Sequence, residues 1–127
     1  MILLDTSVLI ELFRIKSKEK SFFYRITANE NSFGISVITH YEVLVGSNHS
    51  QGEFWKELFE TISILPFDLQ CSVAAINIYK DLKSKNKLIE LADLAVGATA
   101  ISNNLPLATL NKKHFERIKD LKIIEPG

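Results

Sequence analysis

The chain begins with residues 1–13, MILLDTSVLIELF, in which a short apolar run ends on an acid. Ile2, Leu3 and Leu4 have the composition of a buried strand, and Asp5 follows them directly. Placing a carboxylate beside a hydrophobic core is costly unless its charge is paired. Asp5 is therefore either the cap of the following helix or a ligand for a metal ion, and the rest of the sequence decides between the two.

The composition is that of an ordinary globular chain. Its 127 residues predict one domain, residues 1–127, and 46% hydrophobic residues are enough to build a core. No run approaches the roughly 18 apolar residues of a membrane span, and the N-terminus has no basic segment of a signal peptide. Cys71 is the single cysteine, which fits a reducing compartment. We expect a cytoplasmic protein without a membrane segment.

Short apolar segments alternate with amphipathic ones along the chain. The spacing predicts strands at 2–4, 33–35, 62–65, 107–108 and 122–124, and helices at 6–13, 17–30, 36–46, 51–61, 69–85 and 91–103. In the second helix Ser17 is the expected cap, and Thr6 or Ser7 begins the first. This alternation predicts an α/β fold with a parallel sheet covered on both faces. Ligands of such sheets bind beyond the carboxyl ends of the strands, where Asp5 lies.

Two further acids stand in apolar surroundings. Glu42 interrupts the apolar stripe of SVITHYEVLVG and is either a metal ligand or a stripe-edge residue that reaches solvent. Asp93 lies in the Ala-rich LADLAVGATA and is either a ligand or a first-turn acid favoured by the helix dipole. Glu90, close by, is first of all helix-start chemistry. Each of the three acids follows a separate strand or helix start, so we expect them to meet at the rim of the sheet.

Three carboxylates at one rim repel one another, and a hard divalent cation relieves that repulsion. Mg²⁺ prefers oxygen ligands and keeps several waters, which leaves positions for phosphate oxygens. This arrangement is typical of metal-assisted phosphodiester hydrolysis. A zinc site is not indicated, because His40, His49 and His114 have no ligand spacing with each other or with Cys71. Walker, dinucleotide-binding and nucleophile-elbow motifs are absent.

The formal net charge of zero argues against a general polyanion binder but not against a nuclease, in which site acids offset basic residues elsewhere. Most of the basic residues fall in three groups, and each group is either a solvated helix face or a contact for a phosphate backbone. The groups are Arg14, Lys16, Lys18 and Lys20; Lys80, Lys83, Lys85 and Lys87; and Lys112, Lys113, Arg117 and Lys119.

The segments LLDTSVLIELF, SVITHYEVLVG, LADLAVGATA and LATLNKKHFERI resemble, in this order, the motifs of PIN domains, and most closely those of VapC-type toxins of toxin–antitoxin pairs. The resemblance runs from residue 2 to about residue 125. It implies a PIN-like three-layer α/β/α sandwich with a central parallel sheet of strand order 3-2-1-4-5. By motif, Asp5, Glu42 and Asp93 fill the three acidic positions of the family, which are both its metal ligands and its catalytic acids.

The resemblance also implies supporting residues. Thr109 matches a hydroxyl residue behind the site, and Thr6 is expected to cap a helix and support the pocket. Asn111 stands where a fourth acid is often found, so it offers an oxygen without a charge. Arg14, Lys16 and Lys112 are expected to contact RNA because they lie close to the motifs.

The implied activity is Mg²⁺- or Mn²⁺-dependent endoribonuclease cleavage. The implied partners are an RNA substrate, a cognate antitoxin protein and a second copy of the chain in a homodimer. Phe22, Phe23, Tyr24, Phe54, Trp55 and Phe59 pack in the core or, in one or two cases, at an interface. Two other functions stay open: a PIN-fold module that binds RNA or protein without cutting, and a nuclease of general RNA processing.

Overall fold

Five parallel strands form the central sheet in a computed structural model that describes residues 1–127. They are β1 (Ile2–Leu4), β2 (Phe33–Ser36), β3 (Ser63–Leu65), β4 (Leu107–Ala108) and β5 (Ile123–Ile124). Their order is β3-β2-β1-β4-β5, so the chain builds outward from β1 to one edge and then returns to the other side of β1. The predicted α/β class and the strand order 3-2-1-4-5 are confirmed.

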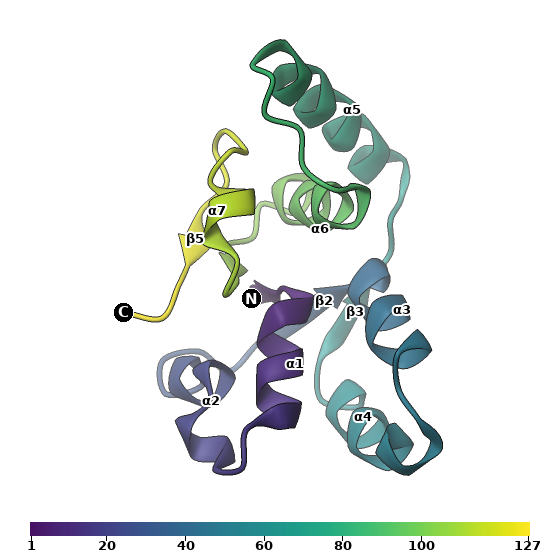
Figure 1. The fold of residues 1–127 in the computed structure, drawn as a ribbon, viewed down its shortest axis with the longest axis vertical. Helices are drawn as coiled ribbons and strands as arrows, with labels where there is room; N and C mark the ends of the chain where they lie inside the picture. The colour runs from purple at the N-terminus through teal and green to yellow at the C-terminus, as the bar shows by residue number, and fades with distance from the viewer.

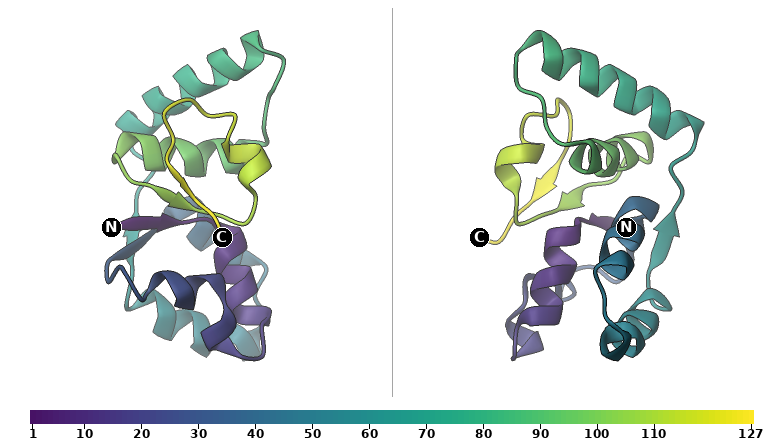
Figure 2. Two further views of the ribbon diagram at one scale, coloured as in Figure 1. Left: turned by 90° about the vertical axis from the view of Figure 1, so that its left-hand side faces the viewer. Right: turned by 45° about the vertical axis from the view of Figure 1, so that its right-hand side comes forward.

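Helices cover both faces of this sheet (Figure 1). α1 (Thr6–Arg14), α2 (Phe22–Ile26) and α4 (Gly52–Phe59) lie on one side. α6 (Leu91–Ser102) and α7 (Lys112–Phe115) lie on the other, and α5 (Leu69–Ser84) packs on the outside of α6 (Figure 2). α3 (Val37–Val45) continues from the carboxyl end of β2 and contacts α1 and α6.

The strand residues divide between two hydrophobic cores because successive side chains of a strand point to opposite faces. Ile2 and Leu4 belong to the core beneath α1, α2 and α4, which also contains Trp55. Leu3 belongs to the core beneath α6 and α7, which also contains Phe115. β1 is buried on both faces, as its continuous apolar sequence predicts.

The helix starts differ from the sequence prediction in two places. The helix expected after Ser17 is a 3-10 turn over Lys18–Lys20, and the following helix is capped by Ser21, whose hydroxyl accepts from the backbone N–H of Tyr24. Thr6 is the first residue of α1 rather than its cap, because Asp5 holds the extended cap position. The short helix α7 was not predicted, since four residues carry no readable period. No helix of the structure is both long enough and apolar enough to cross a membrane.

Gly97 marks the closest approach between α6 and the segment after α7. A Cβ atom there would lie 2.4 Å from Cδ1 of Ile118, which is itself buried. We expect Gly97→Val to lower the free energy of unfolding by about 1–3 kcal/mol through overpacking. Urea denaturation measures the change. As a control, Gly52→Ala should be neutral or stabilising, because a Cβ at Gly52 meets nothing within 4 Å and its backbone is helical.

Candidate active site

The Asp5 carboxylate is held by side-chain hydroxyls and not by the backbone N–H groups of the helix that it precedes. Asp5 occupies the cap position of α1, yet its side chain makes no capping hydrogen bond. Its Oδ2 accepts from the hydroxyl of Ser7 at 2.7 Å and from that of Thr109 at 2.9 Å. Its Oδ1 accepts no hydrogen bond from the protein, although Asp5 is only 3% exposed. Helix capping therefore does not account for this acid.

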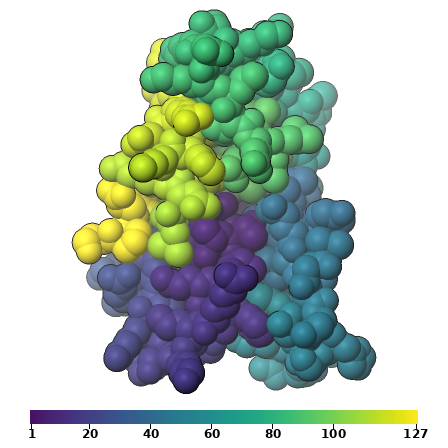
Figure 3. All heavy atoms as spheres, in the orientation of Figure 1, coloured from purple at the N-terminus to yellow at the C-terminus, as the bar shows by residue number.

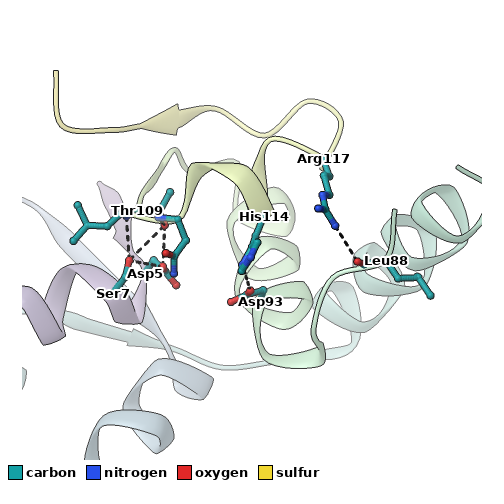
Figure 4. Close-up of polar contacts among 9 residues, drawn as sticks. Asp5, Ser7, Leu88, Asp93, Thr109, His114 and Arg117 are labelled. Carbon is teal, nitrogen blue, oxygen red and sulfur yellow. Dashed lines mark hydrogen bonds and ion pairs between the residues drawn. The ribbon is translucent and has the colours of Figure 1, made fainter. Parts of the chain in front are cut away.

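The same hydroxyls fasten the segment after β4 to the start of α1 (Figure 4). The Thr109 hydroxyl accepts from the backbone N–H of Asn111 at 2.9 Å, and the Ser7 hydroxyl accepts from that of Leu110 at 3.1 Å. The backbone N–H of Asp5 donates to the carbonyl of Ala108 at 2.9 Å. Asp5 and Thr109 thus face each other at the carboxyl ends of β1 and β4, where the strand order reverses.

Glu42 has a polar partner in spite of its apolar sequence neighbours. The hydroxyl of Thr6, at the start of α1, donates to Glu42 Oε1 at 2.8 Å and lies 3.0 Å from the hydroxyl of the buried Thr39. Glu42 Oε2 accepts no hydrogen bond. The Thr6 hydroxyl therefore holds one oxygen of Glu42, and it does so from inside the helix and not as a cap.

Asp93 lies in the first turn of α6 and pairs with a histidine that the sequence gave no reason to place there. Its Oδ2 is 3.0 Å from Nδ1 of His114 in α7 (Figure 4). Burial raises the pKa of the Asp93 carboxyl, and the charges of Asp5 and Glu90 act in the same direction, whereas the hydrogen bond and charge of His114 lower it. Asp93 Oδ1 accepts no hydrogen bond.

All three predicted acids line one hollow of about 470 Å³, together with a fourth acid, Glu11. Its wall is built by α1, α3, the start of α6 and the segment after β4, which meet on one face of the molecule (Figure 3). We call this hollow the acidic pocket. Its lining residues are Asp5, Thr6, Ser7, Ile10, Glu11, Arg14, Glu42, Asp93, Leu110 and Asn111.

The acidic pocket offers oxygen atoms as metal ligands, which suit a hard divalent cation such as Mg²⁺. Asp5, Glu42 and Asp93 each have one oxygen held by a protein donor and one that accepts no hydrogen bond. No three His, Cys, Asp or Glu side chains, however, lie close enough to hold a metal ion together. Like charges repel, and His114 binds the Asp93 carboxylate from the side of α7. The donor chemistry fits the cation, and a ligand set of three carboxylates stays a prediction.

The other predicted site residues separate into two sets. Asn111 and Arg14 line the acidic pocket. Lys16 is exposed and does not line it. Lys112 pairs with Glu125 at 3.0 Å, an interaction whose hydrogen bond and charge raise the pKa of the lysine. A contact of Lys16 or Lys112 with RNA stays a prediction.

Three residues of the site were not predicted from the sequence: Glu11, His114 and, as a partner of Asp5, Ser7. Ser7 was assigned only to the helix start, although its spacing of two residues from Asp5 is that of a local side-chain hydrogen bond. Glu11 accepts from the backbone N–H of Phe22 at 2.6 Å and so joins α1 to α2. His114 could not be assigned because its contact with Asp93 spans 21 residues and comes from the unpredicted helix α7.

Comparison with known proteins is consistent with this geometry. A family model described as the PIN domain matches residues 2–121 of the chain. The chain belongs to the PIN-domain family. A relative named ribonuclease VapC1, from Methanocaldococcus jannaschii, is 41% identical to this PIN domain over 98% of the chain and 87% of the relative.

Solved structures of PIN-domain proteins have the same fold. VapBC-1 from nontypeable Haemophilus influenzae superposes with a TM-score of 0.84 at 28% identity, over 98% of each chain. A toxin–antitoxin complex from Klebsiella pneumoniae superposes with a TM-score of 0.79 at 26% identity, over 98% of this chain and 96% of that chain. The resemblance of the sequence to PIN domains, and to VapC-type proteins among them, is confirmed.

Thr109→Val tests the hydroxyl that joins β4 to Asp5. The substitution preserves shape but removes the donor to Asp5 and the acceptor for the N–H of Asn111, in a side chain that is fully buried. We expect the free energy of unfolding to fall by about 1–3 kcal/mol. Thr61→Val is the matched control, since the Thr61 hydroxyl makes only an exposed bond to a carbonyl. Equal losses in both variants, measured by urea denaturation, would contradict the assignment.

Asp93→Asn tests how much the ionised, half-buried Asp93 carboxylate lowers the free energy of unfolding. A carboxyl whose pKa is raised on folding weakens the fold once it ionises, so the wild type loses stability as pH rises from the ordinary Asp value of about 3.9 through the raised pKa. In EDTA we expect the variant to be more stable than the wild type above the raised pKa, and this gain to vanish below about pH 3.9. Urea denaturation at a series of pH values measures the difference. Asp120→Asn, at an exposed turn, should show no such gain.

Proposed function

We propose that this PIN domain is a metal-dependent endoribonuclease that acts as the toxin of a toxin–antitoxin pair. The observation that carries the proposal is the acidic pocket, which Asp5, Glu42 and Asp93 all line, each with one oxygen that accepts no hydrogen bond from the protein. The ribonuclease name of the Methanocaldococcus jannaschii relative supports the activity. The toxin–antitoxin complex from Klebsiella pneumoniae supports the biological setting.

Asp5, Glu42 and Asp93 are the residues that would hold Mg²⁺ or Mn²⁺. When bound, such a cation polarises a phosphate oxygen and lowers the pKa of an attacking water. The protein supplies orientation: Ser7 and Thr109 fix Asp5, Thr6 fixes Glu42, and His114 fixes Asp93. Ligand carboxylates in metal sites are held by hydrogen bonds of this kind.

Arg14 is the cation of the acidic pocket that is free to bind a phosphate. It lines the pocket, is exposed, and makes no hydrogen bond or ion pair within the chain. Its guanidinium can bind two phosphate oxygens at once. Asn111 adds an uncharged amide at the same wall. We propose that Arg14 positions the RNA backbone against the acids.

The proposed partners are an antitoxin protein and a second copy of the chain. Most of the aromatic residues considered for an interface are core residues instead, since Phe22 and Trp55 are buried and Phe23, Phe54 and Phe59 pack against the same core. Tyr24 is the exception, at 55% exposure. Apolar side chains are also exposed on α3 and α5, among them Tyr41, Val45, Leu69 and Val73, and these are available for association.

Cleavage of a pool of structured RNAs tests the activity. We expect discrete cuts with Mg²⁺ or Mn²⁺, none with EDTA, and a loss of about a hundredfold or more in rate for Asp5→Asn and Asp93→Asn. Asp81→Asn is the matched control, because this partly exposed acid lies on α5 and pairs with Lys85 outside the acidic pocket.

Each other outcome separates the alternatives. RNA that is bound without being cut, by wild-type protein in both metals, would favour the non-cleaving binding module. Metal-dependent cuts that Asp5→Asn and Asp93→Asn leave undiminished would contradict the assignment of the acids. Cleavage of every RNA at many positions would favour a nuclease of general RNA processing.

A further inference from the structure

A second hollow, of about 250 Å³, adjoins the acidic pocket. The two share Ile10, Arg14 and Glu42, so the second hollow is next to any phosphate that binds at the acids. We call it the side pocket. Its lining residues are Ile10, Phe13, Arg14, Glu42, Val43, Gly46, Ser47, Gln51 and Trp55.

Gln51 presents a hydrogen-bond donor whose identity is fixed by its other contact. Its Oε1 accepts from the backbone N–H of Asn48 at 2.9 Å, while the Asn48 side chain accepts from the backbone N–H of Gln51 at 3.1 Å. Because a backbone N–H can only donate, the oxygen of the amide has to face Asn48. The free end of the side chain is therefore the NH₂ group, which makes no hydrogen bond in the chain.

Trp55 adds a second donor. The residue is 2% exposed, and its indole N–H makes no hydrogen bond within the chain. No buried side-chain nitrogen of the structure lacks a partner, so this N–H reaches solvent. Trp55 lines the side pocket, and we take this hollow as the place where the N–H meets a ligand.

The remaining wall residues are mainly apolar, with one cation, Arg14, and one acid, Glu42, whose Oε2 accepts no hydrogen bond from the protein. Ile10, Phe13 and Val43 supply apolar surface, and Arg14 supplies further donors at the junction with the acidic pocket. Glu42 is the one acid of the wall, and its Oε1 already accepts from Thr6. The side pocket thus combines apolar walls with donors from Gln51, Trp55 and Arg14, which suits a flat group that carries hydrogen-bond acceptors.

We propose that the side pocket binds a keto nucleobase, guanine or uracil, of a nucleotide next to the scissile phosphate. Guanine presents the keto oxygen O6 and uracil presents O4, whereas adenine and cytosine carry an amino donor at the corresponding position; the N7 acceptor is common to both purines. Against the NH₂ of Gln51, an amino group leaves two donors facing each other and unpaired. The inference deepens the proposed function and rests on it for the place of the phosphate.

Trp55 is the only tryptophan of the chain, so its indole N–H gives one assignable NMR signal. The probes are GMP, UMP, AMP and CMP, each added to the full chain without metal. We expect the indole signal to shift with GMP and UMP at concentrations about tenfold lower than with AMP and CMP, since one hydrogen bond is worth about that factor. Equal shifts with all four nucleotides, or none, would overturn the side-pocket assignment without any assay of cleavage.

Gln51→Glu reverses the chemistry of the donor without loss of the fold. A glutamate at this position accepts from the N–H of Asn48 in the same way, because Gln and Glu both serve in this capping arrangement. The variant replaces the free NH₂ by a carboxylate oxygen, so we expect AMP and CMP to become the tighter ligands. Gln70→Glu, the same change on α5, is the control and should keep the wild-type order.

The cut positions on RNA provide the second measurement. Wild-type protein should favour guanine or uracil on one side of the cut by about tenfold, and Gln51→Glu should favour adenine or cytosine at that same position. Metal-dependent cutting with an unchanged base profile in Gln51→Glu would overturn the side pocket and leave the proposed function intact. A nucleotide-dependent Trp55 shift in a protein that cuts no RNA would support the pocket and contradict the nuclease.

Discussion

The pairing of β1 with β4 is the constraint on which the rest of the molecule depends. These two strands join the first and last thirds of the chain, and the strand order reverses between them. Beyond their ends the Thr109 and Ser7 hydroxyls bind the Asp5 carboxylate, and the same hydroxyls accept the backbone N–H groups of Asn111 and Leu110. One polar cluster therefore joins the end of β4 to the end of β1, accepts the backbone N–H groups that follow β4 and orients Asp5.

The acidic pocket opposes the stability of the fold that holds it. Burial and the neighbouring acids raise the pKa of Asp93, which means that its ionised form is held at a cost. His114 lowers that cost through its hydrogen bond and its charge. A site that kept four acids along one wall for structure alone would be better served by amides, which keep hydrogen bonds without repulsion. The arrangement is consistent with a site that binds a metal cation or a cationic side chain of a partner protein.

The parts of the molecule that sequence predicted are those governed by local pattern. β1, with apolar side chains on both faces, could be recognised as a central strand, and the acids at Asp5, Glu42 and Asp93 stood out against apolar neighbours. What was missed depends on contacts between distant segments. His114 contacts Asp93 from a helix of four residues, which is too short to show a period. The helix expected to begin after Ser17 begins after Ser21 instead, and a 3-10 turn lies between the two serines. Motif order supplied the strand order, which periodicity alone does not determine.

The two adjoining hollows differ in the hydrogen-bonding groups that line them, which are mainly acceptors in one and mainly donors in the other. The acidic pocket presents acceptors, namely the free carboxylate oxygens, whereas the side pocket presents donors from Gln51 and Trp55. Arg14 and Glu42 stand at the boundary and belong to both. The difference follows from the fold, because Asp5 lies at the end of β1, Asp93 in the first turn of α6 and Glu42 within α3, while Gln51 and Trp55 come from the turn after α3 and from α4. A nucleotide has groups that would suit both hollows. Its phosphate binds metal ions, and a keto base offers acceptors for hydrogen-bond donors. In the proposed nuclease, substitutions at Gln51 or Trp55 would change the preferred base and leave the acids in place, so the choice of RNA would be separate from the chemistry of cutting.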